Sequence, residues 1–243
     1  MLPTLIQSEK SAARLSQIKT NWSQLFAATR PSGEATTEAQ RQLLINYSGA
    51  VYRYLVGTVR NEDTASDLAQ DFAVRFLRGN FGSVTPEKGR FRDFLKRTLS
   101  NLVNDHFRKQ KTEQNRFQTV AQNETLISET TSDTFDQDWV IEILRRTWEA
   151  LRQRQQEKST AYYAVLRARA ESPEMNSQQL CDVLSVELPQ QTVNDVWVRQ
   201  NLSRARKVFA TLLRAEVAGT LKDSRPEIVD EELMALGLLK YCQ

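Results

Sequence analysis

The stretch "GRFRDFLKRTLSNLVNDHFRK", residues 89–109, repeats aromatic, aliphatic and cationic side chains at helical spacing. At 100° per residue, one side collects the apolar residues with one threonine and the sole histidine, namely Phe91, Phe94, Leu95, Thr98, Leu99, Leu102 and His106. The other side is polar and mostly cationic, with Asp93, Lys96, Arg97, Ser100, Asn104, Arg108 and Lys111. The pattern predicts an amphipathic helix whose polar face is either a solvated basic surface or a surface for nucleic acid.

The charge distribution around this helix favours the second interpretation. Residues 88–111 contain eight Lys or Arg against two Asp, whereas residues 112–138 contain six Asp or Glu against one Arg. The chain as a whole carries a net charge of only +3, so the positive charge is concentrated locally. Clustered cations suit a phosphate-rich partner because each neutralised phosphate releases condensed counterions.

Helical periodicity continues through the rest of the 243 residues, which contain only 8 glycines and 6 prolines. One further example of the spacing is the series Val140, Ile143, Leu144, Thr147, Trp148 and Leu151. Alternating β-branched runs bounded by hairpin turns are not evident. We therefore expect an all-α fold.

A polar segment divides the predicted helices into two groups. Residues 111–133 have few large apolar side chains and are rich in Thr, Gln, Asn and Ser, so they bury too little surface to offset the cost of ordering. We expect a helical domain over residues 1–111, a flexible acidic linker over 112–134 and a second helical domain over 135–243.

The helix predicted over residues 62–78 has an acidic face opposite its apolar one. The outward positions are Asp63, Asp67, Gln70, Asp71 and Val74. Three interpretations are open: a solvated surface, a docking surface for a basic protein, or metal ligands and acid–base groups. The last is the weakest, because carboxylates along one helix rarely converge on one atom without partners from elsewhere.

Residues 176–221 have the pattern of a helix-turn-helix. Ser177 is a candidate cap for a short helix, a proline-containing break follows at residues 188–191, and either Thr192 or Asn194 could cap the long helix after it. We expect a buried stripe of Val198, Leu202, Ala205, Phe209 and Leu212. The outward face would be Val196, Arg199, Gln200, Ser203, Arg204 and Lys207. An amide-bearing basic face after a turn is what a recognition helix in the major groove requires.

Other function classes find little support. Cys181 and Cys242 lie far apart and outside any CxxC pair, so neither a disulfide framework nor a zinc site is expected. His106 is the only histidine, and we expect no metal or other cofactor. The longest stretch without a charge, residues 42–52, is too short to cross a bilayer, and the amino terminus lacks a secretory signal pattern. We expect a cytoplasmic protein that is not an enzyme.

Several separated motifs resemble one family. These are "TNWSQLF" at residues 20–26, "DLAQDFAVRFL" at 67–77, "TPEKGRFRDFL" at 85–95, "VRQNLSRARKVFATLLRAEVAGTL" at 198–221 and "DEELMALG" at 230–237. In this order they resemble bacterial RNA polymerase sigma factors of the extracytoplasmic-function type, particularly the divergent group typical of planctomycetes. The chain departs from that group in lacking its usual turn glycine and in having Ser203 where a histidine is frequent.

The resemblance implies a role for each surface. The face of Asp63, Asp67, Gln70, Asp71 and Val74 would dock on the clamp helices of the largest polymerase subunit, with the polymerase flap as a second contact. The melting of promoter DNA would fall to Lys88, Arg90, Arg92, Lys96, Arg97, Asn101, Arg108 and Lys109. The more distant promoter element would be read by Arg199, Gln200, Ser203, Arg204 and Lys207. An anti-sigma factor is a further candidate partner.

Three alternatives compete with this function. A two-domain DNA-binding regulator that never touches polymerase would explain both basic helices but not the acidic face. An RNA-binding protein is less consistent, because the aromatic residues fall on apolar stripes. A metal nuclease using Asp63, Asp67 and Asp71 lacks a second carboxylate cluster to close its site.

Overall fold

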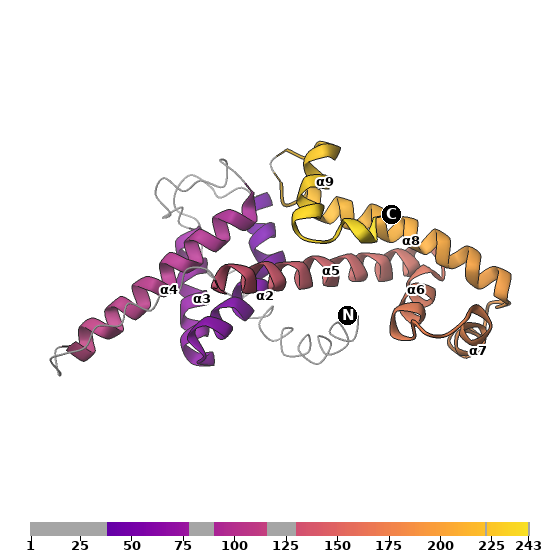
Figure 1. The fold of residues 1–243 in the computed structure, drawn as a ribbon, viewed down its shortest axis with the longest axis horizontal. Coiled ribbons are helices and arrows are strands. Elements are labelled where there is room, and N and C mark those ends of the chain that lie inside the picture. Colours follow the sequence, from indigo (N-terminus) through magenta and orange to yellow (C-terminus); the bar gives the residue numbers. More distant parts are fainter. Residues whose placement is uncertain (1–37, 78–89, 116–129, 222, 243) are drawn as a thin grey trace. The chain divides into compact units, whose positions relative to one another are not determined.

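The computed structural model describes residues 38–77, 90–115, 130–221 and 223–242 (Figure 1). Every regular element in these ranges is helical, which confirms the predicted all-α class. The chain divides into two compact units, and the division falls between Glu142 and Ile143, within a single long helix. The described residues before this point, together with residues 220–221, are called the amino-terminal unit, and the other residues from Ile143 onward the carboxy-terminal unit.

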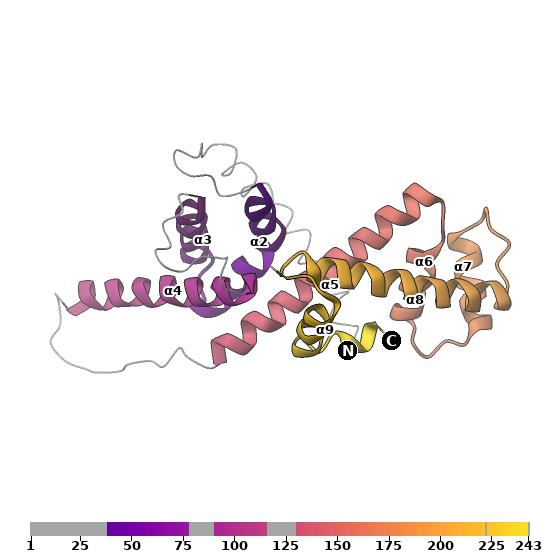
Figure 2. The same cartoon turned by 90° about the horizontal axis from the view of Figure 1, so that it is seen from above.

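The amino-terminal unit contains α2 (Glu38–Val59), α3 (Glu62–Leu77), α4 (Phe91–Asn115) and the first turns of α5 (Thr130–Lys158). Helix α2 packs against both α3 and α4, as Figures 1 and 2 show. The chain reverses between α2 and α3 through Arg60, whose φ is 54°, and Asn61, whose side chain accepts a hydrogen bond from the Thr64 amide at 2.8 Å. Asn61 thereby caps α3 and fixes where that helix begins.

Aromatic side chains fill the core of this unit. Phe76 of α3 lies edge-on to Phe91 and Phe94 of α4, with ring centroids 6.3 and 5.9 Å apart. Phe91, Phe94, Leu95, Thr98, Leu99 and Leu102 are all buried, as the 100° periodicity predicted. The opening stretch of the sequence is therefore a helix whose apolar face holds α3 and α4 together.

The start of α5 completes the same core. Phe135 and Trp139 are fully buried, and Trp139 stacks on Tyr47 of α2 with ring centroids 4.1 Å apart. The sequence-based boundary assigns both residues to the second domain, but they pack within the amino-terminal unit. Helix α4 also continues to Asn115 and α5 begins at Thr130, so both ends of the expected 112–134 linker are helical, while residues 116–129 lie outside the described ranges.

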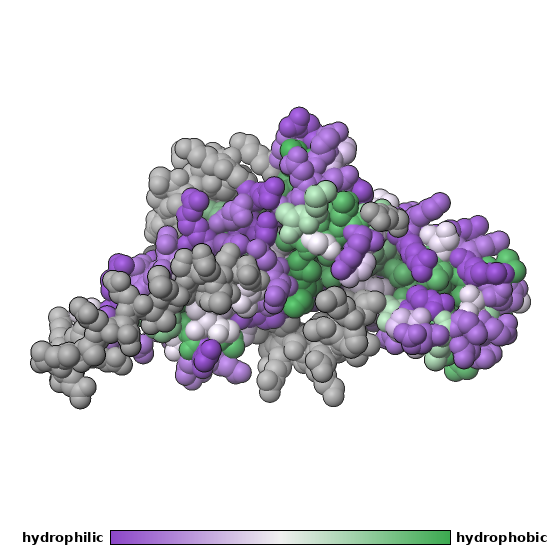
Figure 3. Space-filling view, viewed as in Figure 1, coloured by the Kyte–Doolittle hydropathy of each residue, from purple (hydrophilic) through white to green (hydrophobic). Residues whose placement is uncertain are grey.

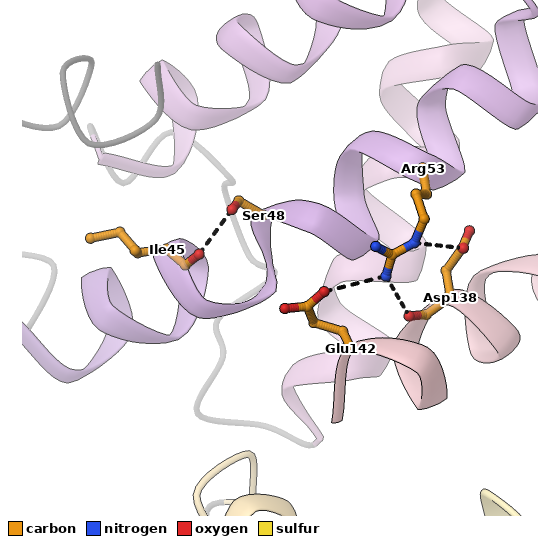
Figure 4. Close-up of polar contacts among 5 residues, drawn as sticks. All are labelled: Ile45, Ser48, Arg53, Asp138 and Glu142. Carbon is orange, nitrogen blue, oxygen red and sulfur yellow. Dashed lines mark hydrogen bonds and ion pairs between the residues drawn. The ribbon is translucent and has the colours of Figure 1, made fainter. Parts of the chain in front are cut away.

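Ion pairs reinforce the contact between α2 and α5 (Figure 4). Arg53 donates to the Asp138 carboxylate at 3.0 Å and approaches Glu142 Oε2 at 3.4 Å. Burial raises the pKa of Asp138, while the Arg53 guanidinium acts in the opposite direction. The Glu142 side chain lies so close to α2 that a Cβ built on Gly49 would be 2.9 Å from Glu142 Oε2.

The carboxy-terminal unit contains the remainder of α5, α6 (Tyr162–Glu171), α7 (Ser177–Glu187), α8 (Asp195–Ala218), α9 (Pro226–Ala235) and a short 3₁₀ helix, η2 (Leu239–Tyr241). Its core joins α6, α7 and α8 through Ala164, Val165, Ala168, Leu180, Cys181, Leu184, Val198 and Leu202. Trp148 of α5 packs on Phe209 of α8 with centroids 5.1 Å apart, and Arg146 pairs with Glu216. The tail is attached to α8 by an ion pair between Arg214 and Asp230.

Candidate nucleic-acid interface

Helix α3 presents an acidic face. Asp63, Asp67 and Gln70 are exposed, whereas Asp71 and Val74 are half-buried. Asp71 is held by Arg75 one turn later, with Arg75 Nη2 2.7 Å from Asp71 Oδ2. The opposite side of α3, with Ala65, Leu68, Phe72 and Phe76, is buried as predicted. The outward face is therefore available to a partner, and its charge sits at the amino-terminal half of the helix.

Local electrostatics reflect that negative charge. Burial, and then the charges of Glu62 and Asp63, raise the pKa of Tyr52 on the neighbouring helix α2. Carboxylates in the first turn of α3 also interact favourably with the positive end of the helix dipole. This surface is suited to a cationic partner rather than to nucleic acid.

The polar face of α4 is only partly available. Arg97, Asn101, Arg108 and Lys109 are exposed, and Arg108 has only a loose contact with Asp105 at 3.7 Å. Lys88 lies outside the described ranges, and Arg90 is half-buried immediately before α4. The exposed cations and the amide of Asn101 form a strip that can bind phosphates along a strand.

Arg92 and Lys96 are occupied by a partner that the sequence did not reveal. Arg92 Nη1 lies 2.7 Å from Asp136 Oδ1, and Lys96 Nζ lies 2.9 Å from Asp136 Oδ2. The Arg92 side chain is 8% exposed. Arg92 therefore fastens α5 to α4, and its expected phosphate contact stays a prediction. Its separation of 44 residues from Asp136 explains why no local pattern could predict the pair.

Helices α7 and α8 are joined by residues 188–194, and their starts are fixed by side-chain caps. Asn176, not Ser177, caps α7, and it forms a reciprocal capping box with Gln179. Of the two candidate caps for α8, Asn194 is the one used, and its side chain accepts from the Trp197 amide at 2.8 Å. The first residue of α8 is therefore Asp195.

The buried and exposed faces of α8 follow the predicted periodicity with one change. Val198, Leu202, Ala205 and Phe209 are buried, but the next buried residue is Leu213 rather than Leu212. The outward residues Val196, Arg199, Gln200, Ser203, Arg204 and Lys207 are all exposed. The structure thus places the predicted base-reading residues together on one face.

Asp195 is a further residue of this face that the sequence analysis did not identify. Its carboxylate lies 2.6 Å from Arg199 Nη2, and both side chains remain substantially exposed. The i,i+4 spacing of an acid and an arginine was the available signal. The ion pair aims the guanidinium of Arg199 along the helix while leaving it accessible.

A separate hollow lies within the carboxy-terminal unit. Its volume is about 480 Å³, and its walls include Leu144, Trp148 and Phe209 with Arg206 and Lys240. Both free cysteines are also in this unit, and burial raises the pKa of Cys181 and Cys242. The two thiols are therefore protonated at neutral pH.

The described ranges lack both a metal-ion cluster and a membrane-spanning helix. They contain no group of three or more His, Cys, Asp or Glu residues arranged to hold a metal ion. None of the helices there is both long enough and apolar enough to span a membrane.

Comparison with known proteins gives one family match. Residues 43–113 match the model described as Sigma-70 region 2, and this segment covers most of α2, all of α3 and almost all of α4. The comparisons with curated proteins and with solved structures found no match. Sigma-70 family proteins are not enzymes, in agreement with the expected class. The acidic face of α3 and the basic strip of α4 therefore both lie in a segment that matches a sigma-70 region 2 domain.

Proposed function

We propose that this chain is a sigma factor of the extracytoplasmic-function type, in its planctomycete-like group, and that it directs core RNA polymerase to promoters through two DNA-binding surfaces. The sigma-70 region 2 domain supports a role in transcription initiation. The observation that carries the proposal is that this match includes both the exposed acidic face of α3 and the exposed basic strip of α4. A protein acting on the polymerase would work in the cytoplasm.

The first proposed contact joins α3 to the clamp helices of the largest polymerase subunit. Asp67 and Gln70 are exposed one turn apart, with Asp63 preceding them and Asp71 and Val74 at the edge of the same face. Opposite charges accelerate association and fix the register of docking. The flap of the polymerase is a second proposed contact, and an anti-sigma factor would compete for such surfaces.

The second proposed contact is the capture of a promoter strand by α4. Arg97, Arg108 and Lys109 would bind phosphates, while Asn101, exposed between them, would contact a base. A base held outside the stack offsets a few kcal/mol of unstacking and so favours melting of the duplex. Lys88 and Arg90 are proposed to complete this surface on the amino-terminal side of α4.

The third proposed contact is made by α7 and α8 acting as a helix-turn-helix in the sigma region 4 position. Its support is the pair of capped helices on a shared apolar core, with Arg199, Gln200, Ser203, Arg204 and Lys207 exposed on α8. Residues near the start of a recognition helix reach base edges, and later cations hold phosphates. Helix α5, which runs from the amino-terminal unit into the carboxy-terminal unit, would then connect two DNA-binding domains.

Gel filtration with core RNA polymerase tests the proposal without DNA. Wild-type protein should co-elute stoichiometrically, and the Asp67→Ala/Gln70→Ala variant should not. A matched control is Glu149→Ala/Gln153→Ala, which removes an exposed acid and an exposed amide from α5. If folded wild-type protein fails to co-elute, a DNA-binding regulator that does not bind polymerase becomes the better description.

A further inference from the structure

Exposed large apolar side chains are few in the described part of the chain. They are Val183, Val186, Val196 and Met234, with exposed fractions of 43%, 84%, 54% and 67%. Figure 3 shows the end that carries α7 and the start of α8 as a mainly hydrophilic surface with isolated apolar residues. Of the four, only Val196 lies on α8, so it alone shares a helix with the proposed base-reading residues.

The position of Val196 is fixed by the cap of α8. Because Asn194 is the cap, Asp195 is the first helical residue and Val196 the second. Arg199, Gln200 and Ser203 follow Val196 at three, four and seven residues, so all four lie on one face. The second residue of a recognition helix is among those that enter the groove most deeply.

Packing does not account for an apolar residue at this position. The neighbouring apolar residues Val193 and Trp197 are partly buried and pack on the core of α6, α7 and α8. Val196 is not among the residues of that core or its surrounding layer, and it remains more than half exposed. Its side chain is therefore available to lose contact with water when a partner covers the start of α8.

Base edges in the major groove offer one apolar group, the C5-methyl of thymine. The other groups displayed there are hydrogen-bond donors and acceptors, which suit Arg199, Gln200 and the Asp195 carboxylate. We propose that Val196 is a specificity-determining residue that contacts the methyl group of one thymine in the promoter element read by α8. This inference rests on the proposed function of α8 as a recognition helix.

Deoxyuridine provides a direct test, because it differs from thymidine only in lacking the methyl group. The full chain, bound to core RNA polymerase of its own organism, is used to select sites from random duplex DNA. Each thymine of the best site is then replaced in turn by deoxyuridine, and Kd is measured by competition. Wild-type protein should bind about three- to fivefold more weakly when one particular thymine is replaced, which corresponds to the burial of a single methyl group.

The variant Val196→Ser removes both methyl groups of the side chain and leaves a small hydroxyl. In this variant the deoxyuridine effect at that thymine should disappear, while effects at other thymines remain. Val186→Ser is the matched control, because it changes an exposed valine outside α8 and should preserve the effect.

Two results would overturn the inference while leaving the recognition helix intact. One is a selected α8 element that contains no thymine on either strand, and the other is a deoxyuridine effect identical in wild-type protein and Val196→Ser. If the folded protein selects no sequence-specific DNA element for α8, this result would overturn the proposed function of α8. The inference about Val196 would then be overturned as well.

Discussion

Tyr47 of α2 and Trp139 of α5 stack with their ring centroids 4.1 Å apart and their planes at 20°, although 92 residues separate them in the chain. Trp139 has no exposed surface. We predict that Trp139→Ala destabilises the protein by about 3 to 5 kcal/mol, because a large buried side chain leaves a cavity. Urea denaturation followed by circular dichroism measures this loss. The neighbouring exposed residue offers the control, since Gln137→Ala should change stability by less than about 0.5 kcal/mol.

The same stacking predicts where the amino-terminal domain ends. A fragment of residues 1–142 keeps Phe135 and Trp139 in the core, whereas a fragment of residues 1–111 removes both. We expect cooperative thermal unfolding for the longer fragment and a broad, non-cooperative transition for the shorter one. Equal cooperativity in the two fragments would show that α5 is dispensable for this fold.

Asp136 provides a test of whether Arg92 is structural. The Asp136→Asn variant removes the Asp136 carboxylate from the nearly buried Arg92 guanidinium, so we expect a loss of about 2 to 3 kcal/mol in the free energy of unfolding. Arg97→Gln, on the exposed side of the same helix, should leave stability almost unchanged and weaken promoter binding instead. Denaturation curves paired with binding measurements separate the two roles. A stable Asp136→Asn protein would contradict the structural role.

The capping box of α7 should be measurable on its own. We predict that Asn176→Ala lowers the free energy of unfolding of the carboxy-terminal unit by about 1 kcal/mol, because the Gln179 amide loses its acceptor. Ser177→Ala, at the cap position that the sequence suggested, should have little effect. The midpoint of a urea titration should shift only for Asn176→Ala, at an unchanged slope.

Lys207 is expected to contribute a phosphate contact without specificity. In Lys207→Gln, promoter binding should weaken to a similar extent for all sites, and the slope of log K against log salt should fall by about 1. Arg152→Gln removes an exposed cation from α5 and should leave the slope unchanged. An unchanged slope in Lys207→Gln would place this residue away from the DNA.

The buried ion pair at Asp138 predicts a pH dependence. Its carboxyl has a raised pKa in the folded protein, so the folded state holds its proton more tightly than the unfolded state does. The contribution of Asp138 to the free energy of unfolding is fully present at pH values below the ordinary carboxyl pKa of about 3.9. This contribution declines as the pH rises through the raised pKa of Asp138 in the folded protein. Asp138→Asn should remove this decline, and denaturation at a series of pH values from about 4 to 7 would detect it. If the free energies of unfolding of wild-type protein and Asp138→Asn change with pH in the same way, the result would contradict a raised pKa for Asp138.

Local patterns in the sequence were sufficient for much of the fold. The apolar faces of α3, α4 and α8 repeat every three to four residues, and the predicted inward positions are buried except His106 and Leu212, which are half-buried. Leu213 is buried in place of Leu212 because both leucines lie close to the edge of the stripe, so periodicity alone cannot rank them. The sequence suggested Ser177 as the cap of α7, whereas Asn176 is the cap in the structure. The two residues are adjacent and both have capping side chains, so the sequence alone cannot distinguish them.

Local sequence patterns could not predict the contacts between distant segments of the chain. The role of Asp136 depends on the side of α4 against which α5 lies, and spacing along one helix carries no information about that choice. A polar composition suggested a linker up to residue 134, yet Phe135 and Trp139 supply two large anchors directly after it. The basic strip was therefore identified correctly as a surface of exposed cations at Arg97, Arg108 and Lys109, but its boundary toward Arg92 was set by tertiary packing.

The close approach of α2 and α5 at Gly49 constrains how this sequence can evolve. A methyl group there would meet the carboxylate of Glu142, which is buried and bonded to Arg53. Alanine is the better helix former by about 1 kcal/mol, so glycine persists at position 49 against local preference. Related sequences should therefore change positions 49 and 142 together, with a larger residue at 49 accepted only where a shorter side chain replaces the glutamate.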